Sequence, residues 1–328
     1  MRMSGATPDH RFAALVAVSF IMVAVPDPSF AEASFWSPHG PVAIEQKAHL
    51  IRVTLLTMIA VLPVLVLVPL MLWRYRYRNK KAKYAPDWEY SGLLDLFMWG
   101  VPIAIVAVLS YQLFLSVKRL DPYRPISTSE ATLRVQVVGL DWKWLFIYPD
   151  LGIATMGEMA FPSDKQVNLE LTSDTVMQSF AVNALAGQIY VMPGMETTLF
   201  LEAIGPGRFE GENMQFNGTG FAQQKFDAVA MSDADFTAWV DRVRSSGIAL
   251  TPSTYQSLSA RSTQAEARAD LGTAAMPATA LFFKSVPDSF FKDVINRYRS
   301  GHPVPADAQP GAPGFSATTA VAGQDPSQ

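Results

Sequence analysis

The chain has 328 residues, of which 49% are hydrophobic and only 17% charged, and its net charge is −3. This length suits one ordinary domain with membrane segments and a tail, and the small net charge gives no reason to expect a nucleic acid partner. The chain contains no cysteine, which excludes disulfides, iron–sulfur clusters, cysteine nucleophiles and every metal site that depends on a thiolate.

The first apolar stretch covers residues 12–25. It is shorter than the roughly 20 residues that a spanning helix needs. Arg2 and Arg11 precede it, and a small-residue cleavage pattern follows, either Ser29-Phe30-Ala31 or Ala31-Glu32-Ala33. The pattern predicts a signal peptide at residues 1–31, followed by a periplasmic N-terminal segment at residues 32–50. A retained membrane anchor is the alternative.

Two longer apolar stretches carry no charge, at residues 53–73 and 96–117. Each is long enough to cross the hydrocarbon core as a helix, and the prolines within them are tolerated in such helices. We therefore predict transmembrane helices at residues 51–73 and 93–117, with a loop between them at residues 74–92. A pair of buried helices in a soluble protein is the alternative.

The loop between the two helices sets their orientation. Six cations lie within residues 74–83, and loops rich in Lys and Arg stay in the cytoplasm. The segments on the other side of both helices must then lie outside. The sequence thus predicts a multi-pass protein of a bacterial inner membrane with its C-terminal part in the periplasm.

The hydrophobic pattern changes to a β pattern beyond the second helix. Residues 133–137 and 167–171 alternate between apolar and polar, and further β-rich runs occupy residues 144–148, 189–192 and 197–201. Turn residues separate these runs. Several short strands with no helix between them indicate a sandwich or barrel, which we place at residues 126–231.

Helical signals return after this β region. Ser232 with Asp235 reads as an N-terminal cap, Thr251 and Pro252 start a second helix, and residues 287–299 suggest a third. We predict a helical C-terminal extension at residues 232–300. The last part, residues 301–328, is rich in small residues and proline and is predicted to be disordered.

Three segments, in order behind this membrane layout, resemble subunit II of haem–copper respiratory oxidases. They read GLDWKW at 139–144, DTVMQSF at 174–180 and GENMQFNGTGFAQQ at 211–224. The resemblance runs over residues 40–299. It implies a transmembrane hairpin followed by a periplasmic cupredoxin-like β-barrel with C-terminal helices, a fold that combines membrane α-helices with an all-β domain.

In the cytochrome c oxidase branch of this family, the last two segments hold a binuclear copper centre. Residue-by-residue matching puts its side-chain ligands at Gln178, Asn213, Asn217, Phe221 and Gln224. Amides are poor copper ligands compared with thiolate and imidazole, and phenylalanine cannot ligate. Gln215 also replaces a glutamate that helps that branch bind magnesium. We expect no metal, no cofactor and no catalytic residue in this chain.

The loss of all five ligands resembles the quinol oxidase branch, of the cytochrome bo type that uses ubiquinol. The resemblance implies a proton-pumping quinol oxidase of the aerobic respiratory chain, in which subunit I carries haems and copper, oxidises quinol and reduces O2 to water. Expected partners are subunits I, III and IV, membrane lipid, and quinol through the complex. This chain is expected to cap the periplasmic face of subunit I without catalysing a reaction alone.

Two other functions compete with this prediction. A subunit II that takes electrons from a cytochrome through copper would need cysteine, which is absent. A membrane-anchored periplasmic cupredoxin-like binding module would need no oxidase partner. Trp142 and Trp144 could suggest an electron relay, but we predict that they pack where the barrel meets a membrane partner.

Overall fold

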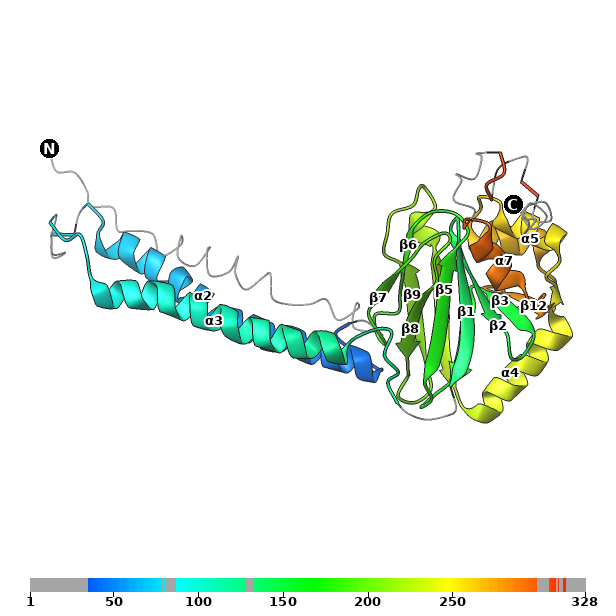
Figure 1. Ribbon diagram of the computed structural model, residues 1–328, viewed down its shortest axis with the longest axis horizontal. Coiled ribbons are helices and arrows are strands. Elements are labelled where there is room, and N and C mark those ends of the chain that lie inside the picture. The colour runs from blue at the N-terminus through cyan, green and yellow to red at the C-terminus, as the bar shows by residue number, and fades with distance from the viewer. Residues whose placement is uncertain are drawn as a thin grey trace, which may run out of the picture.

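The computed structural model describes residues 35–77, 79–80, 87–127, 132–299, 307–310, 312 and 315–316. The protein has two parts, a long helical hairpin and a β domain whose C-terminal helices lie on the side far from the hairpin (Figure 1). The predicted signal peptide at residues 1–31 and most of the predicted tail at residues 301–328 lie outside the described residues.

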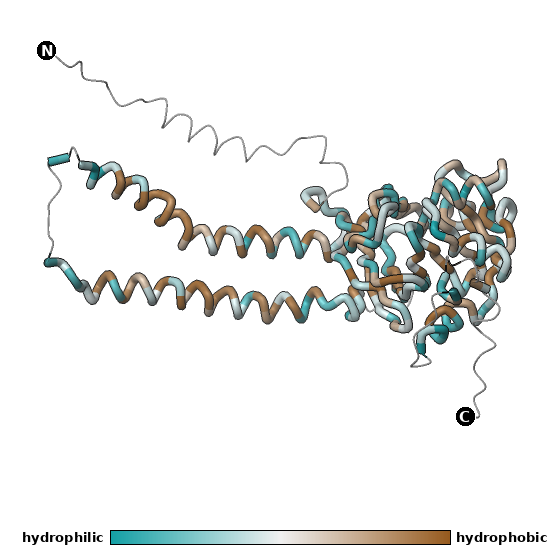
Figure 2. Tube along the Cα trace, turned by 90° about the horizontal axis from the view of Figure 1, so that it is seen from above, coloured by the Kyte–Doolittle hydropathy of each residue, from teal (hydrophilic) through white to brown (hydrophobic). Residues whose placement is uncertain are grey.

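The hairpin consists of two antiparallel helices, α2 (Pro41–Arg74) and α3 (Gly92–Arg119). Both are long and apolar enough to cross a membrane, and Figure 2 shows their hydrophobic middle sections. Helix α2 begins ten residues before the transmembrane helix predicted at residues 51–73, because Pro41 at its first position favours helix initiation. At 1.5 Å per residue, its 34 residues extend about 51 Å, well beyond a core of about 30 Å.

The hairpin meets the β domain through the first turn of α2. The Ala43 amide donates to the Leu185 carbonyl oxygen at 3.2 Å, and Gly40 lies so close to Leu185 and Glu202 that a Cβ would collide with their backbone. Farther down, His49 Nδ1 and Ser116 Oγ are 2.9 Å apart and join the two helices. Helix α2 therefore runs unbroken from the predicted spanning segment to the β domain.

The β domain contains two sheets packed face to face. The seven-stranded sheet has the order β11-β12-β3-β2-β1-β5-β8, with β1 (Leu133–Leu140), β2 (Lys143–Tyr148), β3 (Ile153–Met156), β5 (Val167–Ser173), β8 (Thr197–Leu201), β11 (Ile248–Ala249) and β12 (Leu281–Ser285). The five-stranded sheet has the order β4-β10-β9-β6-β7, with β4 (Glu158–Pro162), β6 (Gln178–Ala181), β7 (Gln188–Val191), β9 (Gly207–Asn213) and β10 (Lys225–Met231). All five predicted strands are confirmed, as parts of β1, β2, β5, β7 and β8.

An aromatic cluster fills the core between the sheets. The ring of Phe180 contacts Trp144 edge-on at 5.2 Å and stacks on Phe226 at 5.1 Å, while Phe146 lies 4.9 Å from Phe226. Trp144 is completely buried. The prediction that Trp144 packs at a partner contact is therefore wrong, because its place in β2 directs the side chain between the two sheets.

The C-terminal extension packs helices and strands onto the seven-stranded sheet. Its helices are α4 (Asp233–Ser246), α5 (Pro252–Ser259), α6 (Gln264–Leu271) and α7 (Phe290–Asn296). The predicted caps are confirmed, since Ser232 and Thr251 accept from the backbone amides of Asp235 and Thr254. The extension predicted as helical at residues 232–300 also supplies β11 and β12, and β12 pairs antiparallel with β3. Its run Leu281 to Phe283 is buried on both faces and so lacks the alternation that marks a half-exposed strand.

Candidate functional site

Four amide side chains meet at the loop end of the β domain, at positions that the sequence comparison singled out. Gln178 begins β6, Asn213 ends β9, Asn217 lies in the loop that follows, and Gln224 stands between the short helix η2 (Phe221–Gln223) and β10. We call these four residues the amide cluster. Three of them are almost fully buried, with exposed fractions of 0% for Gln178, 3% for Asn213 and 1% for Gln224.

Gln224 is the centre of the amide cluster. Its Oε1 accepts from Asn213 Nδ2 at 3.0 Å and from Asn217 Nδ2 at 2.8 Å. Its Nε2 donates to Gln178 Oε1 at 2.6 Å and to the Leu140 carbonyl oxygen at 3.2 Å. Both ends of this amide are thus engaged, and the cluster joins β6, the β9–β10 connection and the end of β1.

The other members tie the surrounding loop backbone. Asn213 Oδ1 accepts from the amides of Ser179 at 2.9 Å and Gln215 at 3.0 Å, and Asn213 Nδ2 donates to the Gln215 carbonyl oxygen at 2.8 Å. Gln178 Nε2 donates to Thr175 Oγ1 at 3.1 Å. Buried backbone groups need such partners, so these side chains fix the shape of the loops.

Phe221, the fifth matched position, does not join the amide cluster. Its ring lies 5.7 Å from that of Phe216. Trp142 covers the same loop, since its Nε1 donates to the Asn217 carbonyl oxygen at 3.3 Å. A Cβ on Gly220 would collide with the Trp142 ring. Glycine is therefore required at this position for the loop to pass beneath the indole.

Exposed apolar side chains surround the amide cluster. Val176 and Met177 directly precede Gln178, Tyr190 pairs with Ser179 across β6 and β7, and the Met214 amide donates to the Ser179 carbonyl oxygen. We call this group the apolar rim, with exposed fractions from 40% to 71% for Val176, Met177, Tyr190, Met214 and Phe216. Such grouping on a domain outside the lipid indicates a contact surface.

A charged cluster lies beside the amide cluster and was missed in the sequence. The carboxylate of Asp174, which is fully buried, accepts from the Tyr255 hydroxyl and the Arg297 guanidinium. The Tyr298 hydroxyl donates to the Asp174 carbonyl oxygen at 2.8 Å. Burial raises the pKa of Asp174, and the charge of Arg297 opposes that rise. We call these four residues the extension clasp, because three of them come from the C-terminal extension.

A buried lysine makes a second link to the extension. Lys143 is fully buried, and its Nζ donates to the carbonyl oxygens of Asp141 at 2.9 Å, Ala260 at 2.9 Å and Ser262 at 2.7 Å. Burial lowers the pKa of Lys143 to about 8, although the charges of Asp141 and Glu266 act in the opposite direction. The ammonium group thus bridges β2 and the α5–α6 connection.

The chemistry available at this site is limited. Within the residues that the structure describes, no group of three or more His, Cys, Asp or Glu side chains is placed to hold a metal ion. The amide oxygens of Gln178, Asn213 and Gln224 already accept hydrogen bonds. Asn217 Oδ1 is buried without a hydrogen-bond partner.

The fold and the site define a class of membrane protein, in which a helical hairpin carries a β-sandwich domain with C-terminal helices. Among curated proteins, the chain is 38% identical over 265 residues to cytochrome bo(3) ubiquinol oxidase subunit 2 of Pseudomonas aeruginosa, covering 81% of this chain and 76% of that protein. It is 43% identical over 221 residues to the protein of that name from Pseudomonas putida, covering 67% and 70%. Ubiquinol oxidase subunit 2 of Acetobacter aceti is 36% identical over 266 residues, covering 80% and 82%. The chain belongs to the ubiquinol oxidase subunit 2 family.

Solved structures similar to the chain include the periplasmic domain of subunit II of cytochrome oxidase of Bradyrhizobium japonicum, with 24% identity, a TM-score of 0.34, and coverage of 35% of this chain and 95% of that chain. A heme-copper terminal oxidase dimer matches with 14% identity, a TM-score of 0.32, and coverage of 40% and 97%. No family model matches the chain. The protein is a multi-pass inner-membrane protein with its β domain in the periplasm, as its family and its two apolar helices indicate.

Proposed function

We propose that this chain is a subunit II without copper in a proton-pumping ubiquinol oxidase of the aerobic respiratory chain. Its partners are subunit I, which binds the haems and copper and carries out quinol oxidation and oxygen reduction, together with subunits III and IV. The names of its curated relatives support the quinol oxidase assignment. In this proposal the chain caps the periplasmic face of subunit I and stabilises the assembly.

The amide cluster is the observation that carries the proposal. Its four amides occupy matched ligand positions and bind one another, with Gln224 engaged at both its oxygen and its nitrogen. A copper ion would have to displace these hydrogen bonds and would gain only weak amide ligands, and Phe221 offers none. The donor set therefore does not fit a copper centre. The cluster holds the loops in the shape that a metal holds elsewhere in the family.

A subunit without a redox centre suits a donor that is dissolved in the membrane. Quinol reaches subunit I from the bilayer, so no electron port is needed on the periplasmic domain. The role left for the domain is contact, and the apolar rim beside the amide cluster supplies a surface for it. The large exposed apolar area of the hairpin serves the same partner and the surrounding lipid.

A pull-down through a C-terminal tag in mild detergent tests this function. We expect haem spectra and quinol-dependent oxygen uptake in the eluate. Elution of the full-length chain alone and colourless from intact membranes would instead favour an anchored binding module. Copper loading of the full-length chain tests the proposed absence of a copper site. We expect no copper binding by equilibrium dialysis. Stoichiometric copper binding that Gln224→Leu abolishes would contradict this part of the proposal.

The capping role has its own test. Replacing Met214 and Phe216 of the apolar rim with serine should reduce the haem that co-purifies with the chain, because an apolar contact is lost at the interface. Ile204→Ser is the matched control, since Ile204 is also exposed, at 52%, but lies outside the apolar rim. A fully assembled, active oxidase after deletion of residues 126–328 would overturn the capping role.

A further inference from the structure

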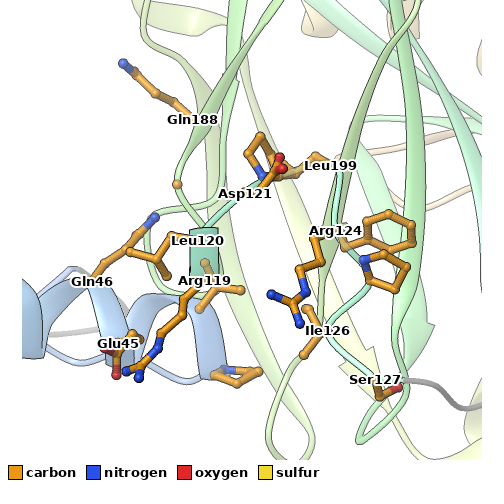
Figure 3. A pocket seen from close by; sticks show the side chains of 16 residues that line it. Glu45, Gln46, Arg119, Leu120, Asp121, Arg124, Ile126, Ser127, Gln188 and Leu199 are labelled. Carbon is orange, nitrogen blue, oxygen red and sulfur yellow. The ribbon is translucent and has the colours of Figure 1, made fainter. Parts of the chain in front are cut away.

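A cavity of about 570 Å³ lies where the hairpin meets the β domain. Three parts of the chain line it: the first turns of α2 with Glu45 and Gln46, the segment that follows α3, and the edge of the β domain at Gln188 and Leu199 (Figure 3). Because it lies between the periplasmic ends of both spanning helices, this cavity is positioned beside the membrane surface. We call it the junction cavity.

The junction cavity begins at the depth of lipid headgroups. The apolar stretch of α3 ends at Val117, two residues before Arg119, and that of α2 starts at Val53, eight residues after Glu45. At 1.5 Å per residue, Arg119 stands about 3 Å and Glu45 about 12 Å beyond the hydrocarbon core. The polar headgroup zone is a layer of roughly 5 to 7 Å directly outside that core. The cavity therefore meets this zone at Arg119 and extends beyond it at Glu45.

Two arginines give the junction cavity a positive wall. Figure 3 shows Arg124 extending its guanidinium into the cavity, while Arg119 reaches from the end of α3 toward Glu45 of α2. Arg124 donates to the Lys118 carbonyl oxygen at 3.2 Å. Among the residues that the structure describes, no ion pair within 4.0 Å involves Arg119 or Arg124. Both guanidinium groups therefore keep donors available for an anion.

The acidic residues of the junction cavity are already engaged. Glu45 forms an ion pair with Arg52 at 2.7 Å, and Asp121 Oδ1 accepts from the Tyr123 amide at 3.0 Å. They therefore do not neutralise the two arginines by direct contact. The cavity also has an apolar part, formed by Leu120, Ile126 and Leu199. A ligand that carries both a phosphate and an apolar body would satisfy both surfaces.

Three cations near the end of α3 lie on the side of the membrane where cations are less common. Lys118, Arg119 and Arg124 lie on the periplasmic side, where juxtamembrane cations oppose the charge bias that orients the helices. The C-terminal end of the α3 dipole favours Lys118 and Arg119 in its last turn. Arg124 lies beyond the helix and also binds its C-terminal end through the Lys118 carbonyl oxygen, while its side chain lines the cavity.

We propose that the junction cavity binds one inner-membrane phospholipid, with Arg119 and Arg124 on its phosphate and its glycerol and upper acyl chains against Leu120 and Ile126. Arginine pairs with phosphate through short, charge-assisted hydrogen bonds. The bound lipid joins the hairpin to the β domain at a place where the protein alone leaves a cavity. This site is independent of the amide cluster and of the oxidase assignment.

Native mass spectrometry of the full-length chain in mild detergent tests the proposal, with added palmitoyl-oleoyl phosphatidylglycerol as the probe. We expect one retained lipid on the unchanged chain, and roughly tenfold lower occupancy when Arg119→Gln and Arg124→Gln are combined, since charge-assisted hydrogen bonds are lost. Arg242→Gln on α4 is the matched control, because it removes an exposed arginine remote from the cavity. Equal lipid retention by the double variant would overturn the proposal.

Two further measurements distinguish the source of the phosphate and the occupant of the cavity. Inorganic phosphate that displaces the lipid and binds equally tightly by calorimetry would assign the arginines to a soluble anion instead. In the assembled complex, a photo-crosslinking amino acid in place of Ile126 should label phospholipid. Labelling of another protein subunit alone would show that a protein fills this place, and the lipid site would be wrong.

Discussion

Two neighbouring regions at the loop end of the β domain each join separate segments of the chain, but with different chemistry. The amide cluster joins loops of the barrel through neutral side chains, whereas the extension clasp and Lys143 join the barrel to the C-terminal extension through buried charges. Neutral networks keep their bonding over a wide pH range. A buried charge is costly to leave unpaired, so attachment of the extension should be far more sensitive to single substitutions and to pH.

The largest effect should come from Arg297→Met, which leaves the buried Asp174 carboxylate without its cation. We expect the free energy of unfolding of the full-length chain to fall by about 3 to 5 kcal/mol, the usual cost of breaking a buried pair. Denaturant unfolding followed by tryptophan fluorescence gives this value. Arg299→Met is the control, since that side chain is exposed, and an equal loss there would refute the distinction between the two arginines.

Lys143 should make stability rise with pH. Its folded pKa of about 8 lies below the ordinary 10.5, so between these values the unfolded chain binds more protons and the free energy of unfolding increases. The full rise corresponds to about 3 kcal/mol. Above pH 10 the buried hydroxyls of Tyr148 and Tyr255, whose pKa values burial raises, act in the opposite direction. Unfolding measured from pH 8 to 10 should show the rise in the unchanged chain but not in Lys143→Met. The control variant Lys165→Met, which replaces a lysine that is 40% exposed, should keep the rise.

A smaller effect is expected within the amide cluster. Gln224→Leu removes the shared partner of Asn213, Asn217 and Gln178, and buried amides without partners cost about 2 kcal/mol in total stability. Hydrogen exchange of peptides covering residues 211–224 should increase. Gln223→Leu at the adjacent exposed position should change little, and comparable exchange in both variants would contradict a structural role for Gln224.

The smallest effect concerns the ion pair between Arg134 and Asp150, which are 2.9 Å apart. Both side chains are exposed, at 44% and 60%, so water and salt screen the pair. Arg134→Gln should therefore lower stability by less than about 1 kcal/mol, and the difference should shrink at high ionic strength. Thermal melts at low and high salt measure it. A loss as large as that of Arg297→Met would mean that exposure does not separate the two pairs.

Local signals in the sequence predicted much of the fold. The alternating runs at residues 133–137 and 167–171 became strands paired in parallel register, with Leu133 opposite Val167. The caps at Ser232 and Thr251 formed as expected, because a cap depends only on residues within one turn. The same kind of signal, a capping box at Thr263 and Glu266, marks α6 and was missed.

Features that depend on distant residues could not be predicted in this way. The resemblance led us to expect amides at these positions in place of metal ligands, but not that Gln178 and Gln224, 46 residues apart, hydrogen-bond to each other. Asp174 and Arg297 are separated by 123 residues, and nothing in their neighbourhoods marks either charge as buried. Such contacts follow from the packing of whole elements.

The place of β12 in the seven-stranded sheet has a consequence for export of the protein. Strand β3 pairs with β2 on one side and with β12 on the other, and β12 follows it by about 125 residues. Until residues 281–285 have crossed the membrane, β3 is an open edge that can pair with another chain. The extension thus covers the last open edge at β3 only at the end of translocation. A product truncated before Leu281 should aggregate in the periplasm even though its other strands are present.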